Sequence, residues 1–133
     1  KNMAERGSNS ALRNEIIAAI GAEHLIEGNF INSPGQTQYE FDIDQSHPLV
    51  SLVCMVAPSP DWFVGVHGLA LFDNGQWVEN QTVALQCYDA GTDSGSSYTS
   101  PNAATSPQAP IQQITPAGET RPLGTFTFER IDP

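Results

Sequence analysis

Basic side chains are scarce in this 133-residue chain, and so is cysteine. Five lysines and arginines stand against fifteen aspartates and glutamates, so the formal net charge is −10 at pH 7. A surface this acidic argues against nucleic acid or an anionic membrane as a partner. No apolar run approaches the roughly 18 residues that a membrane-spanning helix needs. The composition therefore argues against a nucleic-acid-binding protein and predicts no membrane span.

The two cysteines, Cys54 and Cys87, each lie in an apolar stretch just upstream of an acidic loop. They form no C-x-x-C pair and no Cys/His spacing of the kind that holds zinc. Two buried free thiols and one disulfide between neighbouring strands both agree with this pattern, since free cysteine is often buried and disulfides need an oxidising compartment. The sequence leaves the two alternatives open.

One helix is predicted near the N-terminus, and strands and turns are predicted after it. In residues 8–23, Leu12, Ile16 and Ile20 recur at helical spacing, and Gly21 follows as a stop signal. The remaining apolar segments are short, and Asn74-Gly75 between two of them is a strong hairpin signal. The predicted strands are QYEFDID, HPLVSLVCMVAP (as a central, buried strand), WFVGVHGLALF, WVENQTVALQCY and GTFTFERI. This pattern favours a mostly β protein, an antiparallel β-sandwich with one short N-terminal helix.

Residues 93–122 are rich in serine, threonine, proline and glycine. A stretch of this length inside one domain is expected to be a long ordered loop or a linker. Long loops in compact domains are usually functional or anchored.

Acidic side chains gather in two of the predicted turns. Asp89 and Asp93 belong to CYDAGTDSG, where glycines permit tight turns, and Asp61 follows PSP in a second turn. Calcium takes six to eight oxygen ligands from carboxylates, backbone carbonyls and water. Three carboxylates from two loops at one end of a sandwich would suit it. The simpler interpretation is that aspartate and glycine are only turn formers here.

Other chemistries find less support. An EF-hand is excluded because the twelfth position counted from Asp89 is Ser100 and not glutamate. Asp93-Ser94-Gly95 matches the D-[ST]-G triplet of aspartic peptidases, but a single copy would act only in a symmetric dimer. The three histidines, His24, His47 and His67, share no metal-binding or catalytic spacing, and each is expected to be a surface or hydrogen-bonded histidine and not a ligand.

Two long motifs carry a resemblance to a known family. PSPDWFVGV at 58–66 and YDAGTDSGSSYTSPN at 88–102 resemble the signature blocks of the spondin N domain, found in F-spondin, mindin and bacterial proteins. The resemblance implies a C2-like antiparallel β-sandwich that is secreted, adhesive and not an enzyme. It also implies that Asp61, Asp89 and Asp93 bind Ca²⁺, because these positions match the calcium-binding aspartates of the family.

The resemblance covers almost the whole chain, so residues 1–133 are predicted to be a single spondin-type domain. Family members begin earlier, with an opening strand segment that this chain lacks, and Lys1 is not preceded by methionine. We therefore expect a vacant sheet edge, filled by self-association or by a strand from another chain. A calcium-binding extracellular matrix or cell-adhesion module is favoured. The alternatives are a structural β-domain of a surface assembly, with calcium holding its loops, and a dimeric aspartic-peptidase-like enzyme using Asp93.

Overall fold

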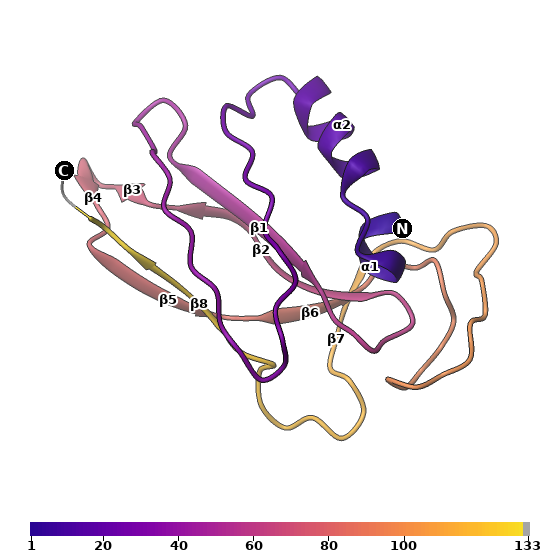
Figure 1. The fold of residues 1–133 in the computed structure, drawn as a ribbon. Coiled ribbons are helices and arrows are strands. Elements are labelled where there is room, and N and C mark those ends of the chain that lie inside the picture. The colour runs from indigo at the N-terminus through magenta and orange to yellow at the C-terminus, as the bar shows by residue number, and fades with distance from the viewer. Residues whose placement is uncertain (132–133) are drawn as a thin grey trace.

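The computed structural model describes residues 1–131 as a mostly β fold with two short helices at the N-terminus (Figure 1). Neither helix in this range is long and apolar enough to cross a membrane. The elements are α1 (Asn2–Arg6), α2 (Ser10–Ala18), β1 (Leu49–Met55), β2 (Trp62–Ala70), β3 (Phe72–Asp73), β4 (Gln76–Trp77), β5 (Asn80–Ala84), β6 (Gln86–Asp89), β7 (Gln112–Ile114) and β8 (Thr125–Glu129).

The main sheet has four antiparallel strands in the order β1-β2-β6-β7. Strand β2 is central, and its Trp62 and Val64 are buried together with Cys87 of β6. Half-buried side chains from the surrounding strands and loops complete this core: Cys54, Val56, Leu85, Tyr98, Ile114 and Leu123. The ring of Tyr98 meets Trp62 edge-on at 5.2 Å between centroids. A loop residue thus closes the core beside the start of β2.

A second ladder pairs β5 with β8, and the chain passes from it into the main sheet through one residue. That residue, Leu85, packs against the core and donates its backbone N–H to the carbonyl of Gly124. Strands that switch sheets in this way form the corners of β-sandwiches. In β8, exposed threonines alternate with half-buried phenylalanines. The predicted antiparallel β architecture and the strand at the C-terminus are confirmed.

The hairpin predicted at Asn74-Gly75 is also confirmed. Phe72 pairs with Trp77 and Asp73 with Gln76, which leaves Asn74 and Gly75 as the two turn residues. Both have positive φ, 50° and 78°. Two consecutive residues with positive φ make the turn that matches the twist of a hairpin, and asparagine followed by glycine adopts it at low cost.

The prediction for residues 47–58 was wrong in one respect. Strand β1 forms there, but it lies at an edge of the sheet and is not central. Among residues 1–131 it pairs with β2 alone, and Val53 on its outer face is 45% exposed. An uninterrupted apolar run favours a strand that is buried on both faces. It does not show whether that strand lies in the middle or at the edge of its sheet.

The helical prediction was incomplete, because the structure has two helices and not one. Helix α2 falls inside the predicted range but ends at Ala18, so Ile20 of the expected apolar stripe is fully exposed. The additional helix, α1, buries Ala4 near β1 and β2. It ends at Arg6 and is capped by Gly7, which has the left-handed conformation with φ 64°. A five-residue helix is too short to show helical periodicity in the sequence.

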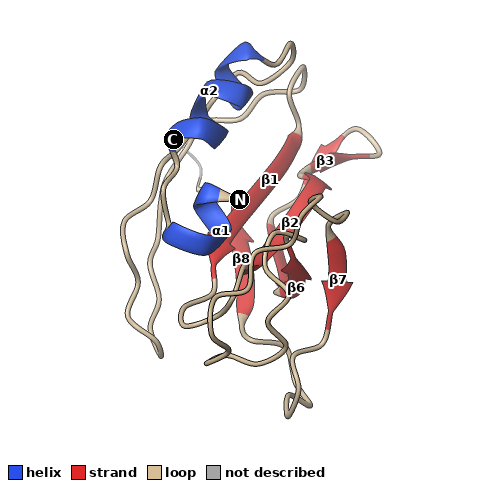
Figure 2. Cartoon of the chain, turned by 90° about the vertical axis from the view of Figure 1, so that its right-hand side faces the viewer, coloured by secondary structure: helices blue, strands red, loops and turns tan. Residues whose placement is uncertain are grey.

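Residues 19–48 contain no helix and no strand, so the strand predicted for QYEFDID was wrong. Tyr39 and Phe41 are 39% and 40% exposed, and Figure 1 shows this segment running along the outside of the fold. The alternation of apolar residues is present, but a strand also needs a partner to accept its backbone hydrogen bonds. Figure 2 shows these loops beside the helices, on the side of β1.

Residues 93–122, predicted as a long ordered loop or a linker, are anchored at several points. Strand β7 lies within this stretch, and Asp93 forms an isolated antiparallel bridge with Ala104. Thr105 and Ala109 donate backbone hydrogen bonds to the carbonyls of Thr92 and Gly91. The stretch is therefore an ordered loop, tied back onto the segment that carries the acidic motif.

Candidate metal centre

The side chain of Asp61 is the most deeply buried acidic group of the described residues, with no exposed surface. It lies immediately before β2, after the turn formed by Ser59 and Pro60. Its Oδ2 atom accepts three hydrogen bonds, from the backbone N–H of Thr92 at 2.6 Å, the hydroxyl of Thr92 at 3.1 Å and the backbone N–H of Asp93 at 3.0 Å. Asp61 thereby fixes the loop that follows β6.

The other carboxylate oxygen of Asp61, Oδ1, is buried and accepts no hydrogen bond. Across residues 1–131, no lysine, arginine or histidine nitrogen comes within 4.0 Å of this carboxylate. A buried carboxylate without a compensating cation is costly, and native proteins pair such groups or use them to coordinate metals. The unpartnered Oδ1 of Asp61 is therefore the atom of this site at which a bound cation would be expected.

Asp93 is also buried and is held by its own loop. Its Oδ1 accepts the backbone N–H of Gly95 at 2.8 Å, and its Oδ2 accepts the backbone N–H of Ala103 at 2.9 Å. Each oxygen keeps a second lone pair. The segment around Asp93 is positioned by the bridge to Ala104, so the carboxylate has a defined place between two stretches of chain.

Asp89 is the last residue of β6 and pairs with Trp62 across the ladder. The next N–H along, that of Ala90, donates to the carbonyl of Asp61 at 3.2 Å, which brings Asp61 and Asp89 to the same end of the sheet. The Oδ1 atom of Asp89 accepts the backbone N–H of Gly91 at 2.7 Å. The three aspartates singled out in the sequence therefore lie around one end of the β2–β6 ladder.

The three carboxylates do not form a tight cluster. Among the described residues, the group of three whose ligand atoms all lie within 4.8 Å of one another is Glu23, Asp44 and His47. A calcium ion accepts six to eight oxygens at 2.3–2.6 Å in flexible geometry, so carbonyls and water supply part of any such shell. The all-oxygen donor set and the orphaned Oδ1 of Asp61 fit a hard divalent cation.

Comparison with known proteins identifies the fold family. The Spondin_N family model matches residues 1–131. The chain belongs to the Spondin_N family. It is 41% identical to human Spondin-2 over 136 residues and 39% identical to rat Spondin-2. Each of these alignments covers 98% of the chain and 41% of the relative, so the chain spans less than half of their length. Spondin-1 of Xenopus laevis is 45% identical over 78 residues, covering 57% of the chain and 10% of the relative.

In this Spondin_N domain, a cavity of about 220 Å³ reaches Asp93 from the outside. Helix α1, the turn before β2 and the acidic loop line it together, through Glu5, Arg6, Ser59, Pro60, Asp93, Ser100 and Asn102. The cavity gives solvent and ions a path to one of the three aspartates, Asp93, whereas the buried Asp61 is not among its lining residues. The C-terminal end of α1 thus forms part of the wall of the site.

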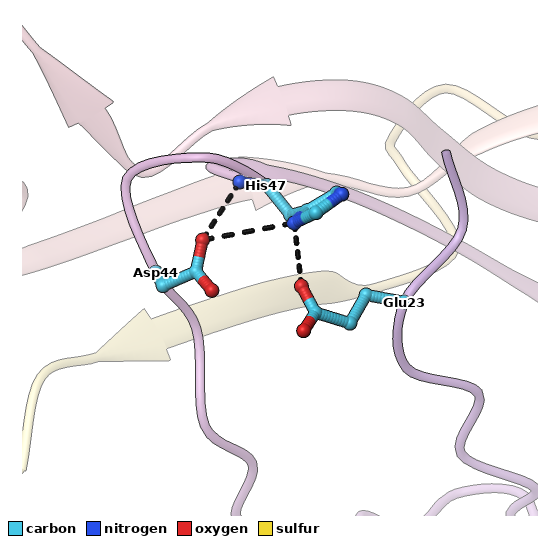
Figure 3. Close-up of side chains that lie close together, drawn as sticks. All are labelled: Glu23, Asp44 and His47. Atoms are coloured by element: carbon cyan, nitrogen blue, oxygen red, sulfur yellow. Dashed lines mark hydrogen bonds and ion pairs between the residues drawn. The ribbon is translucent and has the colours of Figure 1, made fainter. Parts of the chain in front are cut away.

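The cluster of Glu23, Asp44 and His47 in this Spondin_N domain was not predicted from the sequence. The three residues come from two segments that lack helix and strand, and no local spacing links them. Histidine 47 was expected to be a surface or hydrogen-bonded histidine and not a ligand. The structure places its imidazole between two carboxylates (Figure 3).

Proposed function

We propose that this chain is a calcium-stabilised binding module of an extracellular protein and performs no catalysis. The observation that carries the proposal is the buried Asp61 carboxylate, which has one oxygen saturated by loop donors and the other without any partner. A calcium ion shared by Asp61, Asp89 and Asp93 would compensate this charge. It would also join the turn before β2 to the loop after β6.

The role of calcium in this proposal is structural, because the ion would fix the loops at one end of the sandwich. Loops held by a rigid scaffold are the usual place for recognition in β-sandwich proteins. Family membership supports an adhesive, secreted role, since the resemblance of the two signature motifs implies it. The acidic surface, with a net charge of −10, favours partners that are cationic or that bind through divalent ions.

The aspartic-peptidase alternative is weakened by the surroundings of Asp93. In such enzymes two carboxylates share one proton across the active site. Here both oxygens of Asp93 accept backbone N–H groups of its own loop and of Ala103. Acid-dependent, pepstatin-sensitive cleavage of a peptide library would overturn the assignment as a non-enzyme.

Thermal unfolding with calcium and with a chelator tests the proposal. If the ion binds only the folded state, it stabilises the protein by about 2.7 kcal/mol at a hundredfold excess over Kd, a rise in Tm of about 10 °C for a domain of this size. Asp89→Asn should lose most of this calcium-dependent rise. The matched control is Asp42→Asn, which removes the same charge from an exposed position.

The outcomes separate clearly. A calcium-dependent rise in Tm in the wild type and in Asp42→Asn, but a much smaller rise in Asp89→Asn, supports the proposal. An identical Tm with calcium and with chelator in the wild type contradicts it. Equal calcium responses in the wild type and Asp89→Asn would remove Asp89 from the site.

A further inference from the structure

Glu23, Asp44 and His47 bring three ligand atoms together on the surface, away from the aspartate loops. The Nδ1 atom of His47 lies 2.5 Å from Oε2 of Glu23 and 3.7 Å from Oδ1 of Asp44. All three ligand atoms lie within 4.8 Å of one another. Figure 3 shows both carboxylates directed at the same nitrogen, with the other nitrogen of the ring turned away from them.

The geometry is close to that of a metal site. Ligands bound to tetrahedral zinc at about 2.0–2.1 Å lie roughly 3.3 Å from one another. The two distances from His47 Nδ1 lie on either side of this value and differ from it by less than about 1 Å. The third separation, between the two carboxylate oxygens, is no more than 4.8 Å. The side chains of Glu23 and His47 are free to move, because each is 41% exposed. The side chain of Asp44 is 53% exposed, but its Oδ1 atom is held by the turn that follows it, so its other carboxylate oxygen would meet the metal.

The charge of the cluster also favours a cation. Two carboxylates lie close together, and across residues 1–131 the one nitrogen base that pairs with either of them is His47 itself. Arginine 13, from the neighbouring helix α2, pairs instead with Glu27. The two carboxylates face the same nitrogen, and a divalent ion at this point would offset the repulsion between their negative charges.

The donor types select the metal. An imidazole nitrogen with two carboxylate oxygens suits zinc and its neighbours in the transition series, whereas calcium and magnesium prefer oxygen alone. We propose that Glu23, Asp44 and His47 form a zinc-class metal site, separate from the aspartate loops, with water completing the coordination. The proposal does not depend on calcium binding at Asp61.

A metal at this position would also have a structural consequence. Glu23 belongs to the segment after α2, and Asp44 and His47 belong to the turn before β1. Between them the chain forms no helix or strand. The conformation of this turn is fixed by hydrogen bonds, because Oδ1 of Asp44 accepts the backbone N–H groups of Ser46 and His47 and the hydroxyl of Ser46. A metal would tie the two ends of residues 23–47 together.

Zinc titration of the intact chain at pH 7.5, followed by calorimetry, tests the proposal. The wild type should bind one zinc ion with micromolar affinity, and His47→Ala should weaken binding about tenfold or more. His24→Ala is the matched control, because it removes an exposed imidazole next to Glu23 that is not part of the cluster. Glu23→Gln should also weaken binding, whereas Glu40→Gln, the same change at another exposed position, should not.

Further measurements exclude other ligands. The Co²⁺-loaded protein should lack a thiolate charge-transfer band, since Cys54 and Cys87 take no part. Millimolar calcium should not displace the metal, because calcium prefers oxygen ligands alone. Absence of saturable zinc binding in the wild type, or equal affinity in His47→Ala, would overturn the proposal. Equal losses in His24→Ala and His47→Ala would do the same.

Discussion

Cys54 and Cys87 occupy the two strands that flank β2, and each is in register with Val64. Adjacent strands are about 5 Å apart, so the two Cα atoms are separated by about 10 Å. A disulfide requires Cα atoms 4.4–6.8 Å apart. Both thiols are free in the structure, which resolves the alternative that the sequence left open.

The first prediction concerns the reactivity of these thiols. Burial raises the pKa of both Cys54 and Cys87. The fraction of each cysteine present as the reactive thiolate at pH 8 is therefore smaller in the folded state than in the unfolded state. We expect slow reaction with a thiol reagent in the native protein and rapid reaction of two thiols per chain after denaturation without reductant. Mass spectrometry that found an intramolecular disulfide would contradict the strand register.

A second prediction concerns Gly91, whose φ of 71° is in the left-handed region. A Cβ atom there would lie 2.2 Å from the carbonyl oxygen of Ala109, so Gly91→Ala combines backbone strain with a collision against main chain. We expect a loss of about 2–4 kcal/mol in the free energy of unfolding. Chemical denaturation measures it.

The control for this substitution is Gly68→Ala. Gly68 has a similar φ of 59°, but a Cβ atom there would meet nothing within 4 Å. Its loss should be limited to the conformational strain, about 1–2 kcal/mol. Equal losses at the two positions would show that the contact between residues 91 and 109 does not restrict the side chain.

The third prediction tests the position of β1 at the edge of the sheet. Val64 of β2 is 5% exposed, whereas Val53 of β1 is 45% exposed. Val64→Ala should cost about 2 kcal/mol or more, from lost burial and the cavity left behind. Val53→Ala should cost less than about 1 kcal/mol. If urea denaturation showed similar losses of stability for Val64→Ala and Val53→Ala, the position of β1 at the edge of the sheet would be contradicted.

A fourth prediction uses Tyr98, the ring that closes the core against Trp62. Burial, and then the hydrogen bond that its hydroxyl donates to Glu119, raise the pKa of Tyr98 to about 12. Because the folded state favours the protonated phenol, this stabilisation is complete below pH 10 and is lost as the pH rises from 10 towards 12.

Spectrophotometric titration of the three tyrosines checks this directly. The hydrogen bonds made by Tyr39 lower its pKa, so it should ionise before Tyr98. Tyr98→Phe should remove the last component of the titration, and Glu119→Gln should move that component to lower pH. If all three tyrosines ionised together near pH 10 in the folded protein, the assignment would be wrong.

The features that were predictable from sequence are those that depend on local chemistry. The Asn74-Gly75 turn formed because its residues tolerate positive φ wherever they occur. The grouping of Asp61 with Asp89 and Asp93 at one end of the sheet followed from turns at the ends of two apolar strands. Whether these aspartates hold calcium stays a prediction.

The features that sequence did not reveal depend on partners far along the chain. QYEFDID alternates as a strand does, but no other segment pairs with it among residues 1–131. The run around β1 is apolar, yet its edge position depends on the order in which strands pair. Glu23 lies beside Asp44 and His47 although Asp44 is 21 residues further along the chain, and no sequence-spacing rule predicts this contact.

The pairing of Trp62 with Asp89 has a consequence for insertions and deletions. Residues 71–85 connect β2 to β6 and include the β3–β4 hairpin and β5. The alignment of β2 with β6 is set by the pairing between these two strands and not by the length of the connection. Extra residues at Asn74-Gly75 would leave Asp61 and Asp89 side by side. Losing a single residue from β6 would shift its pairing by one position and turn every side chain to the opposite face. Insertions and deletions are therefore tolerable in the β3–β4 hairpin and disruptive in β6, the four residues that precede the acidic loop.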